Sequence, residues 1–209
     1  MLLHDPAMQE ELTETRIHTA LTANLEQRIL IWLAERLPTW VSPDHLTALA
    51  LIAQIAAGAA YAGRLLWLVN LCLVLNWFGD SLDGTVARVR NQQRPRYGFY
   101  VDHIADAIGA FALMAGLGFS GYIHWPIAIG MLLCFYLHSI ESYLATHTIG
   151  RFHVSRGLFG PTEIRILLAI ANIFPGSFNI GGAIAIAGMT AMLVMTCARH
   201  TALLYREGR

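Results

Sequence analysis

The chain has 209 residues, of which 56% are hydrophobic and only 13% are charged, and its formal net charge is zero. Soluble domains carry about 25% charged residues. This composition therefore excludes an ordinary soluble domain and predicts an integral membrane protein. We expect it to have no nucleic-acid partner.

The first segment, 1–40, is predicted to be distinct from a transmembrane domain formed by 41–209. Within 11–37, apolar residues recur every three or four positions among Thr, Glu, Gln and Arg, and Pro38 ends the pattern. The recurring apolar residues are Leu21, Leu25, Ile29, Trp32 and Leu33. This spacing predicts an amphipathic juxtamembrane helix. The helix lies either on the cytoplasmic membrane surface or against the protein's own bundle, and the periodicity fits both placements.

Six apolar segments of roughly bilayer-spanning length follow this first segment. They cover 45–62, 65–86, 97–119, 125–145, 162–174 and 180–197. The fifth segment is short for a full crossing. The pattern predicts an all-α integral membrane fold, in which a bundle of six transmembrane helices follows the amphipathic helix.

The basic residues predict the orientation of the bundle in the membrane. All 14 Lys and Arg residues are arginines, and with six spans only Arg64 lies on the side opposite the termini. Basic residues concentrate on the cytoplasmic side of membrane proteins, so we expect both termini in the cytoplasm. A short chain without lysine and without a targeting signal suits a bacterial inner membrane.

Four aspartates lie inside the second and third apolar segments, where an ionised carboxylate is costly. They are Asp80 and Asp83 in the second segment, and Asp102 and Asp106 in the third. Charged side chains at membrane depth usually face a bundle interior or a watery cavity and mark a functional site. Helical spacing places each pair on one face of its helix, and the short connection makes the two helices antiparallel neighbours. We therefore expect the four carboxylates to converge near the cytoplasmic face.

The residue types around these aspartates favour chemistry at phosphorus. Carboxylate oxygens select Mg²⁺, Mn²⁺ or Ca²⁺, and two such ions balance four negative charges and suit in-line displacement. Small side chains at Gly84, Ala87 and Gly98 leave room for a bulky nucleotide, although small residues in membrane helices more often serve helix packing. Arg88 is either a phosphate contact or a topology residue whose charge reaches the membrane surface.

The complete pattern reads Asp80-x-x-Asp83-Gly84-x-x-Ala87-Arg88, a spacer of nine residues, and Gly98-x-x-x-Asp102-x-x-x-Asp106. It resembles the signature of the CDP-alcohol phosphotransferase family, membrane enzymes of phospholipid synthesis. The spacer is one residue longer than is common in that family. The resemblance implies a six-helix bundle, usually a homodimer, with two divalent cations under a CDP-linked substrate. It also implies that an alcohol attacks the β-phosphate and that CMP leaves.

The resemblance also implies roles for particular residues of this chain. Asp80, Asp83, Asp102 and Asp106 would hold two Mg²⁺ or Mn²⁺ ions, and Asp106 is also the usual candidate for the catalytic base. The CDP moiety would be contacted by Gly84, Ala87, Arg88 and Gly98. Residues 41–209 are then the catalytic domain.

A weaker resemblance to the choline and ethanolamine phosphotransferase branch lies in Asp102-His103, Tyr143, Gly150 and Thr162-Glu163. In that branch the donor is a soluble CDP-amino alcohol and the acceptor is diacylglycerol. His103 is then a second candidate for the base, because a free imidazole titrates near neutral pH whereas metal-bound carboxylates are poor bases. The alternative is that His103 points away from Asp102 and caps a neighbouring helix.

Two other functions remain as alternatives. A phosphatidyltransferase of the same family would use CDP-diacylglycerol and a soluble alcohol acceptor. A divalent-cation transporter would use the carboxylates as a pathway for ions. The acids gather at one membrane face instead of spreading through the bilayer, which disfavours transport, and CMP release separates an enzyme from a transporter.

Polar residues outside the pattern receive mainly structural interpretations. Asn76 lies one turn before the first aspartate on the same face, so it is a weak candidate to support the site. Glu141 requires a partner at membrane depth, for which we expect Arg165 or His147, with a head group as the alternative. Arg165 is otherwise a topology residue at a helix start, and Asp44 is expected to cap the first span.

Overall fold

The computed structural model describes residues 23–149 and 161–207, and every regular element in these residues is a helix. In chain order the elements are α2 (Ala23–Arg36), α3 (Pro43–Ala62), α4 (Leu66–Val89), α5 (Pro95–Ser120), α6 (Trp125–Ile149), α7 (Pro161–Ile173), the short 3-10 helix η1 (Pro175–Ser177) and α8 (Phe178–Glu207). The predicted all-α fold is confirmed for this part of the chain.

Four of these helical stretches are long and apolar enough to cross a membrane, namely α3, α5, α6 and the run Pro175–Arg206 that contains η1 and most of α8. The α4 helix has 24 residues but is not among them, because its asparagines and aspartates lower its hydropathy. The α7 helix has 13 residues and reaches only about 20 Å, which is short of a hydrocarbon core of about 30 Å. The integral membrane class is supported, and six full spans remain a prediction.

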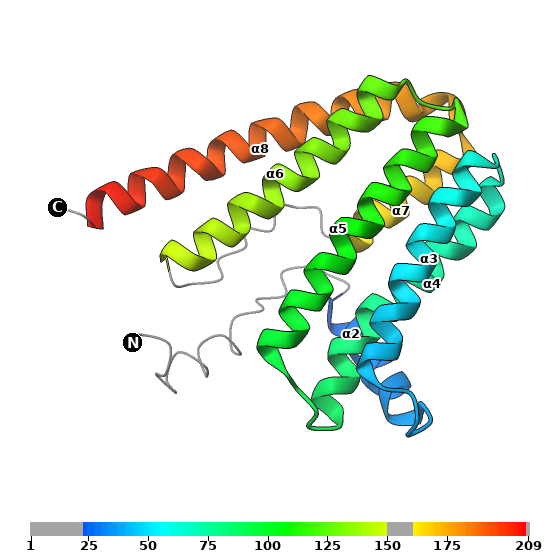
Figure 1. Cartoon of the computed structure of the whole chain (residues 1–209), viewed down its shortest axis with the longest axis vertical. Coiled ribbons are helices and arrows are strands. Elements are labelled where there is room, and N and C mark those ends of the chain that lie inside the picture. Colours follow the sequence, from blue (N-terminus) through cyan, green and yellow to red (C-terminus); the bar gives the residue numbers. More distant parts are fainter. Residues whose placement is uncertain (1–22, 150–160, 208–209) are drawn as a thin grey trace.

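The α3, α4 and α5 helices form the core, and α3 packs against both of the others (Figure 1). Glycines let the backbones meet. A Cβ atom added to Gly58 of α3 would overlap the carbonyl oxygen of Ala112 on α5, and one added to Gly79 of α4 would overlap the carbonyl oxygen of Leu46 on α3. Small residues permit such close contacts between membrane helices. These glycines therefore allow α4 and α5 to pack closely against α3.

The α7 helix packs on α4 and is tied to the core by a buried polar network. The hydroxyl of Tyr61 on α3 donates to Asn172 Oδ1 over 2.8 Å, and Asn172 Nδ2 donates to Asn70 Oδ1 on α4 over 2.6 Å. Tyr61 and Asn172 are both buried. Because each buried polar group has a partner, the network holds the C-terminal end of α7 against the core at little desolvation cost.

The α2 helix packs on α4. Its residues Leu30 and Ala34 are buried in a cluster with Leu82 and Val86 of α4, whereas Trp32 on its other face is 52% exposed. Packing against the protein's own helices is one of the two placements that the sequence left open. Residues 11–22 of the predicted amphipathic helix lie outside the described residues.

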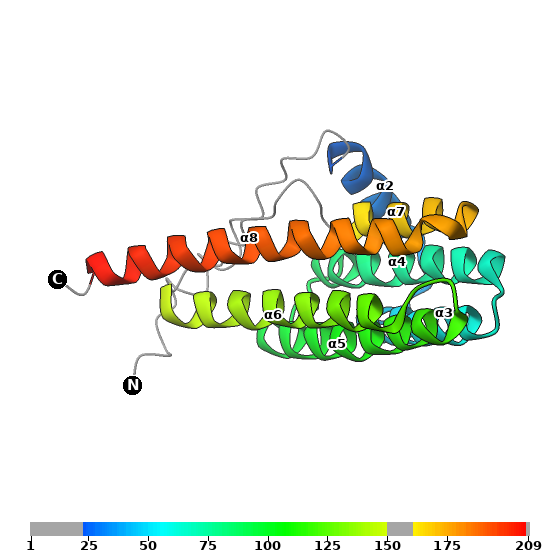
Figure 2. The ribbon, with the colours of Figure 1, turned by 90° about the horizontal axis from the view of Figure 1, so that it is seen from above.

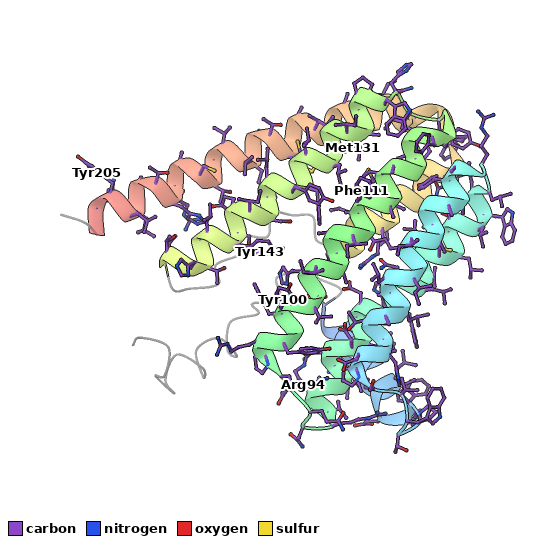
Figure 3. The ribbon with its side chains drawn as sticks, in the orientation of Figure 1. Arg94, Tyr100, Phe111, Met131, Tyr143 and Tyr205 are labelled. Carbon is purple, nitrogen blue, oxygen red and sulfur yellow. The ribbon has the colours of Figure 1, made fainter. Side chains whose placement is uncertain are left out.

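The α6 and α8 helices pair with each other and diverge from the core along most of their length (Figure 1 and Figure 2). In the most apolar 18-residue stretch of each, only 6% of the residues are buried inside the protein, compared with 39% for α3 and 33% for α5. The two helices run parallel to each other (Figure 1). Side chains stand out on both sides of this α6–α8 pair, and Tyr205 lies near its far end (Figure 3). The α6–α8 pair meets the core mainly through contacts between α6 and α5.

Candidate functional site

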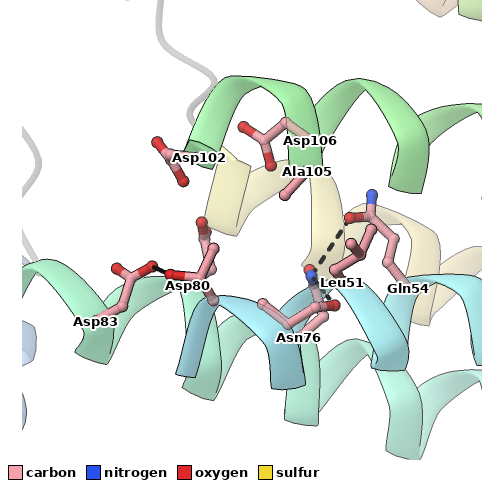
Figure 4. Close-up of a pocket in the computed structure, with 10 residues that line it drawn as sticks. Leu51, Gln54, Asn76, Asp80, Asp83, Asp102, Ala105 and Asp106 are labelled. Atoms are coloured by element: carbon pink, nitrogen blue, oxygen red, sulfur yellow. Dashed lines mark hydrogen bonds between the residues drawn. The ribbon is translucent and has the colours of Figure 1, made fainter. Parts of the chain in front are cut away.

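A pocket that contains all four motif aspartates lies between α4 and α5 and is lined on a third side by α3 (Figure 4). Its lining residues are Thr47, Ala50, Leu51, Gln54, Asn76, Asp80, Asp83, Asp102, Ala105 and Asp106. The cavity has a volume of about 10 Å³, which is the space that one water molecule needs. The pocket therefore matches the size of an ion or a water molecule, and a nucleotide would have to lie outside it.

Three of the four aspartates form a compact group. Asp80 of α4 and Asp102 and Asp106 of α5 each offer one carboxylate oxygen, and these oxygens all lie within 4.8 Å of one another. Figure 4 shows the two α5 residues facing α4 across the pocket. Converging carboxylate oxygens are the ligands that Mg²⁺ and Mn²⁺ prefer, so the group is suited to hold a divalent cation.

Asp83 lines the same pocket but stands apart from this group of three. The hydroxyl of Thr47 on α3 donates to Asp83 Oδ2 over 2.6 Å, and the backbone N–H of Gly84 donates to Asp83 Oδ1 over 2.5 Å. Both oxygens thus have protein donors. The structure brings together three of the carboxylates that were expected to converge, and it holds the fourth beside them through a threonine on a third helix.

Arg165 of α7 contacts the site from the side of α4. Its Nη2 donates to Asp80 Oδ2 over 2.6 Å, and its Nε donates to Asn76 Oδ1 over 2.8 Å. Asn76 is buried, and its Nδ2 donates to the carbonyl oxygen of Ala50 over 3.0 Å. Asn76 thus supports the site, as its position in the sequence suggested. The role of Arg165 beside Asp80 was missed, because no local pattern links α7 to the motif.

His103 lies on α5 next to the aspartate group. Its Nδ1 is 2.6 Å from the carbonyl oxygen of Phe99, and since a carbonyl only accepts, that contact requires a proton on Nδ1. The ring stacks on Phe99 at 4.0 Å between centroids and meets Tyr143 of α6 edge-on at 5.2 Å. With Nδ1 donating, Nε2 is the ring nitrogen that is left to accept a proton. His103 bonds within its own helix, so it does not cap a neighbouring one.

The glycines of the motif differ from the packing glycines of the core. A Cβ atom added to Gly98 would meet nothing within 4 Å, and one added to Gly84 would meet only the Arg88 Nη1 atom at 3.5 Å. These two positions therefore border open space and do not serve close helix packing among the described residues. Arg88 is exposed, and its Nη2 donates to Thr85 Oγ1 over 3.1 Å. Ala87 is partly buried.

Two expectations for residues outside the motif were wrong. Glu141 pairs with His200 of α8 over 2.6 Å, and not with Arg165 or His147. Arg165 lies on α7, whereas α6 packs on α8, and His147 is six residues further along α6, which places it on a different face of the helix. The cap of α3 is Ser42, whose side chain accepts from the His45 backbone N–H. Asp44 lies in the first turn instead and pairs with Arg94 over 2.7 Å.

The residues of the weaker resemblance are only partly described. Tyr143 contacts His103 as stated above. Gly150 lies outside the described residues, and the side chains of Thr162 and Glu163 also lie outside what the structure describes.

Comparison with known families and proteins adds independent support for the motif. The sequence profile of the family described as CDP-alcohol phosphatidyltransferase matches residues 40–203, which is well over half of the chain. This range includes all four aspartates as well as Arg165.

Two curated relatives are similar to this chain. It is 27% identical over 157 residues to cholinephosphotransferase 1 of Danio rerio, which covers 66% of this chain and 39% of that protein. It is 22% identical over 134 residues to archaetidylinositol phosphate synthase of Pyrococcus horikoshii, which covers 64% of this chain and 70% of that protein. The chain thus spans well under half of the first relative and about two thirds of the second.

Proposed function

Because the chain belongs to the CDP-alcohol phosphatidyltransferase family, we propose that it transfers a phosphoalcohol group from a CDP-alcohol to an alcohol acceptor in phospholipid synthesis and releases CMP. The observation that carries this proposal is the convergence of Asp80, Asp102 and Asp106, whose oxygens lie within 4.8 Å of one another. These residues come from two separate halves of the motif and two different helices. Their meeting at one pocket supports the proposal, because divalent cations held there suit phosphoryl transfer.

The proposed cofactor is a pair of Mg²⁺ or Mn²⁺ ions. Asp80, Asp102 and Asp106 would supply most of the ligands, and Asp83 would contribute from the same pocket. Bound there, divalent cations stabilise the phosphate oxygens that gain charge during displacement. The small volume of the pocket supports one of the two ions within it. The second ion and the CDP moiety would lie outside, the CDP moiety near Gly84, Ala87, Arg88 and Gly98, where the two glycines border open space.

In the proposed reaction, the acceptor hydroxyl oxygen forms a bond to the β-phosphorus of the donor. The bond between that phosphorus and the bridging oxygen breaks, and CMP leaves with the electron pair. We assign the hydroxyl proton to Nε2 of His103, because Nδ1 is already committed to the Phe99 carbonyl oxygen. The side chain of His103 is 27% exposed, so an acceptor has access to it. Asp106 is the alternative base.

The proposed acceptor is a membrane lipid such as diacylglycerol, and the proposed donor is a soluble CDP-amino alcohol. Two observations support this choice. The third aspartate of the motif is followed by His103, and the chain is 27% identical to a relative named cholinephosphotransferase 1. Both point toward the same branch of the family.

A second candidate is a phosphatidyltransferase that uses CDP-diacylglycerol and a soluble alcohol. The likeness to archaetidylinositol phosphate synthase supports it, at 22% identity over 134 residues. One relative thus supports each candidate, and the histidine after Asp102 favours the first.

We also propose that α4 and α7 complete a six-helix membrane bundle, with both termini and the mouth of the pocket in the cytoplasm of a bacterial cell. The position of the pocket supports this arrangement, since the aspartates lie near the α4–α5 connection, where Arg90, Arg94 and Arg96 gather. A homodimer is the proposed assembly.

CMP release by the purified protein tests the proposed function. CDP-choline, CDP-ethanolamine and CDP-diacylglycerol are each offered with diacylglycerol or with soluble alcohols, in the presence of Mn²⁺ or of a chelator. We expect CMP release from a CDP-amino alcohol only with diacylglycerol and only with the metal. Release from CDP-diacylglycerol and a soluble alcohol would select the second candidate. No CMP from any pair would reject the enzyme and leave the carboxylates to a transport role.

A further inference from the structure

Arg165 brings a fixed positive charge to the aspartate pocket from a helix that does not belong to the motif. It lies in α7, its side chain is only 15% exposed, and the side chain of its partner Asp80 is 24% exposed. A guanidinium on an apolar helix is costly unless it is paired. Its hydrogen-bond partners Asp80 and Asn76 both lie on α4. The side chains that compensate the buried charge of Arg165 are therefore those of the pocket.

Arg165 contacts Asp80 without occupying the cavity. The residues that line the cavity come from α3, α4 and α5, and Arg165 is not among them. Its Nη2 binds Asp80 Oδ2, while an oxygen of Asp80 still lies within 4.8 Å of oxygens of Asp102 and Asp106. The guanidinium therefore binds a residue of the group of three without lining the cavity between them.

The orientation of Arg165 is set by Asn76. The buried amide of Asn76 donates through Nδ2 to the Ala50 carbonyl oxygen on α3 over 3.0 Å, which directs Oδ1 toward Arg165 Nε. A backbone group of α3 thus orients Asn76, Asn76 orients Arg165, and Arg165 orients Asp80. A planar guanidinium suits this arrangement, because its donors are held in a rigid fork.

We propose that Arg165 is a positioning residue, which holds the Asp80 carboxylate toward Asp102 and Asp106 and thereby strengthens the binding of divalent cations. The inference rests on the proposed function, since it takes the pocket as a cation site. Substitution of a residue that hydrogen-bonds to a metal-ligating side chain typically weakens metal affinity by about 10- to 100-fold. Arg165 belongs to this class because it touches a carboxylate and no reacting atom.

The test is a Mn²⁺ titration of purified protein, followed by the electron paramagnetic resonance signal of free Mn²⁺. We expect Arg165→Gln to weaken Mn²⁺ binding by about 10- to 100-fold. The Mn²⁺ concentration needed for half-maximal CMP release should rise by the same factor, while KM for the CDP donor stays unchanged. Arg165→Lys should fall between wild type and Arg165→Gln, because one ammonium group reproduces the charge but not the planar fork.

Two control variants separate positioning from general effects. Asn172→Leu removes the polar tie at the other end of α7 without touching the pocket, so it reports on loosened docking of that helix. Arg64→Gln removes an arginine whose Nε donates to the Ser120 carbonyl oxygen at a different place in the fold, so it reports on the loss of one positive charge. Both controls should bind Mn²⁺ like the wild type.

The outcomes are distinct. If Arg165→Gln and Asn172→Leu lose affinity equally, α7 docking explains the effect and the inference is wrong. If Arg165→Gln binds Mn²⁺ more tightly, Arg165 competes with the cation and the inference is also wrong. If the wild type binds Mn²⁺ and Arg165→Gln binds it equally well, only the role of Arg165 is rejected. A wild-type protein that binds no Mn²⁺ would reject the proposed metal site itself.

Discussion

Two core helices, α3 and α5, are about as apolar as α6 and α8, but the core and the α6–α8 pair differ in how their helices meet. In the most apolar 18-residue stretches of α3 and α5, 39% and 33% of the residues are buried inside the protein. In the corresponding stretches of α6 and of Pro175–Arg206, which contains most of α8, the share is 6%. The core has glycines where backbones cross, and a Cβ atom added to one of these glycines would collide with the backbone of the facing helix. Apolarity thus commits a helix to the membrane, and small residues determine which helices pack closely.

The two regions also use polar groups differently. In the core, polar side chains from α3, α4, α5 and α7 gather around the aspartate pocket. Between α6 and α8, Glu141 and His200 form an ion pair at 2.6 Å, and the Cys134 sulfur lies 3.7 Å from the Thr190 hydroxyl. Polar contacts of this kind join two membrane helices, whereas the pocket positions several carboxylates at once. We therefore expect activity to depend on the core and changes in the α6–α8 pair to affect stability.

The largest expected effect comes from Asp102→Asn in the core. The substitution removes a charge from the group of three carboxylates, and we expect CMP release to fall at least about 100-fold, since even indirect supports of a metal ligand contribute 10- to 100-fold. Mn²⁺ binding should weaken in parallel. Activity close to that of the wild type would break the link between the core and the chemistry.

Gly116→Ala on α5 tests the packing side of the comparison. The added Cβ atom would overlap the carbonyl oxygen of Gly58 on α3, and overpacking of this kind lowers the free energy of unfolding by about 1–3 kcal/mol. The matched control is Gly188→Ala on α8, where a Cβ atom meets nothing within 4 Å. Thermal unfolding in detergent should show a lower Tm for the first variant and an unchanged or higher Tm for the second. Equal shifts would contradict the account of the core.

Thr47→Val tests whether α3 serves the site as well as the packing. The hydroxyl that donates to Asp83 Oδ2 is lost, and we expect a fall in CMP release of about tenfold, which matches a hydrogen bond to a charged group. Thr47→Ser keeps the donor and should retain most of the activity. If the valine variant is as active as the serine variant, the bond between Thr47 and Asp83 is irrelevant to turnover.

Glu141→Gln in the α6–α8 pair should have the smallest effect on activity. The pair with His200 loses its charge but keeps an acceptor, so we expect a modest fall in Tm and unchanged CMP release and Mn²⁺ affinity. A large loss of turnover would show that the α6–α8 pair takes part in the chemistry and would contradict the distinction between the two regions.

Much of the site was predictable because its key residues lie close together in the sequence. The spacing of Asp80, Asp102 and Asp106 on two helices joined by a short loop predicts that they face one another, and the structure brings them together. The open space at Gly84 and Gly98 also agrees with the expected clearance beside the site.

The rest of the site could not be predicted because it depends on contacts between distant helices. Thr47 on α3 holds Asp83 away from the other carboxylates, and Arg165 on α7 contacts Asp80. Neither contact has a signature in the spacing of residues along one helix. The pairing of Glu141 with His200 was missed for the same reason, because it depends on α6 diverging from the core with α8.

The most direct test of the central claim is anomalous X-ray scattering from crystals grown with Mn²⁺. The account predicts an anomalous peak between the carboxylates of Asp80, Asp102 and Asp106, at about 2.0–2.6 Å from their oxygens, as hard divalent cations bind oxygen ligands. Mn²⁺ peaks located only elsewhere, with these three carboxylates turned apart, would contradict it.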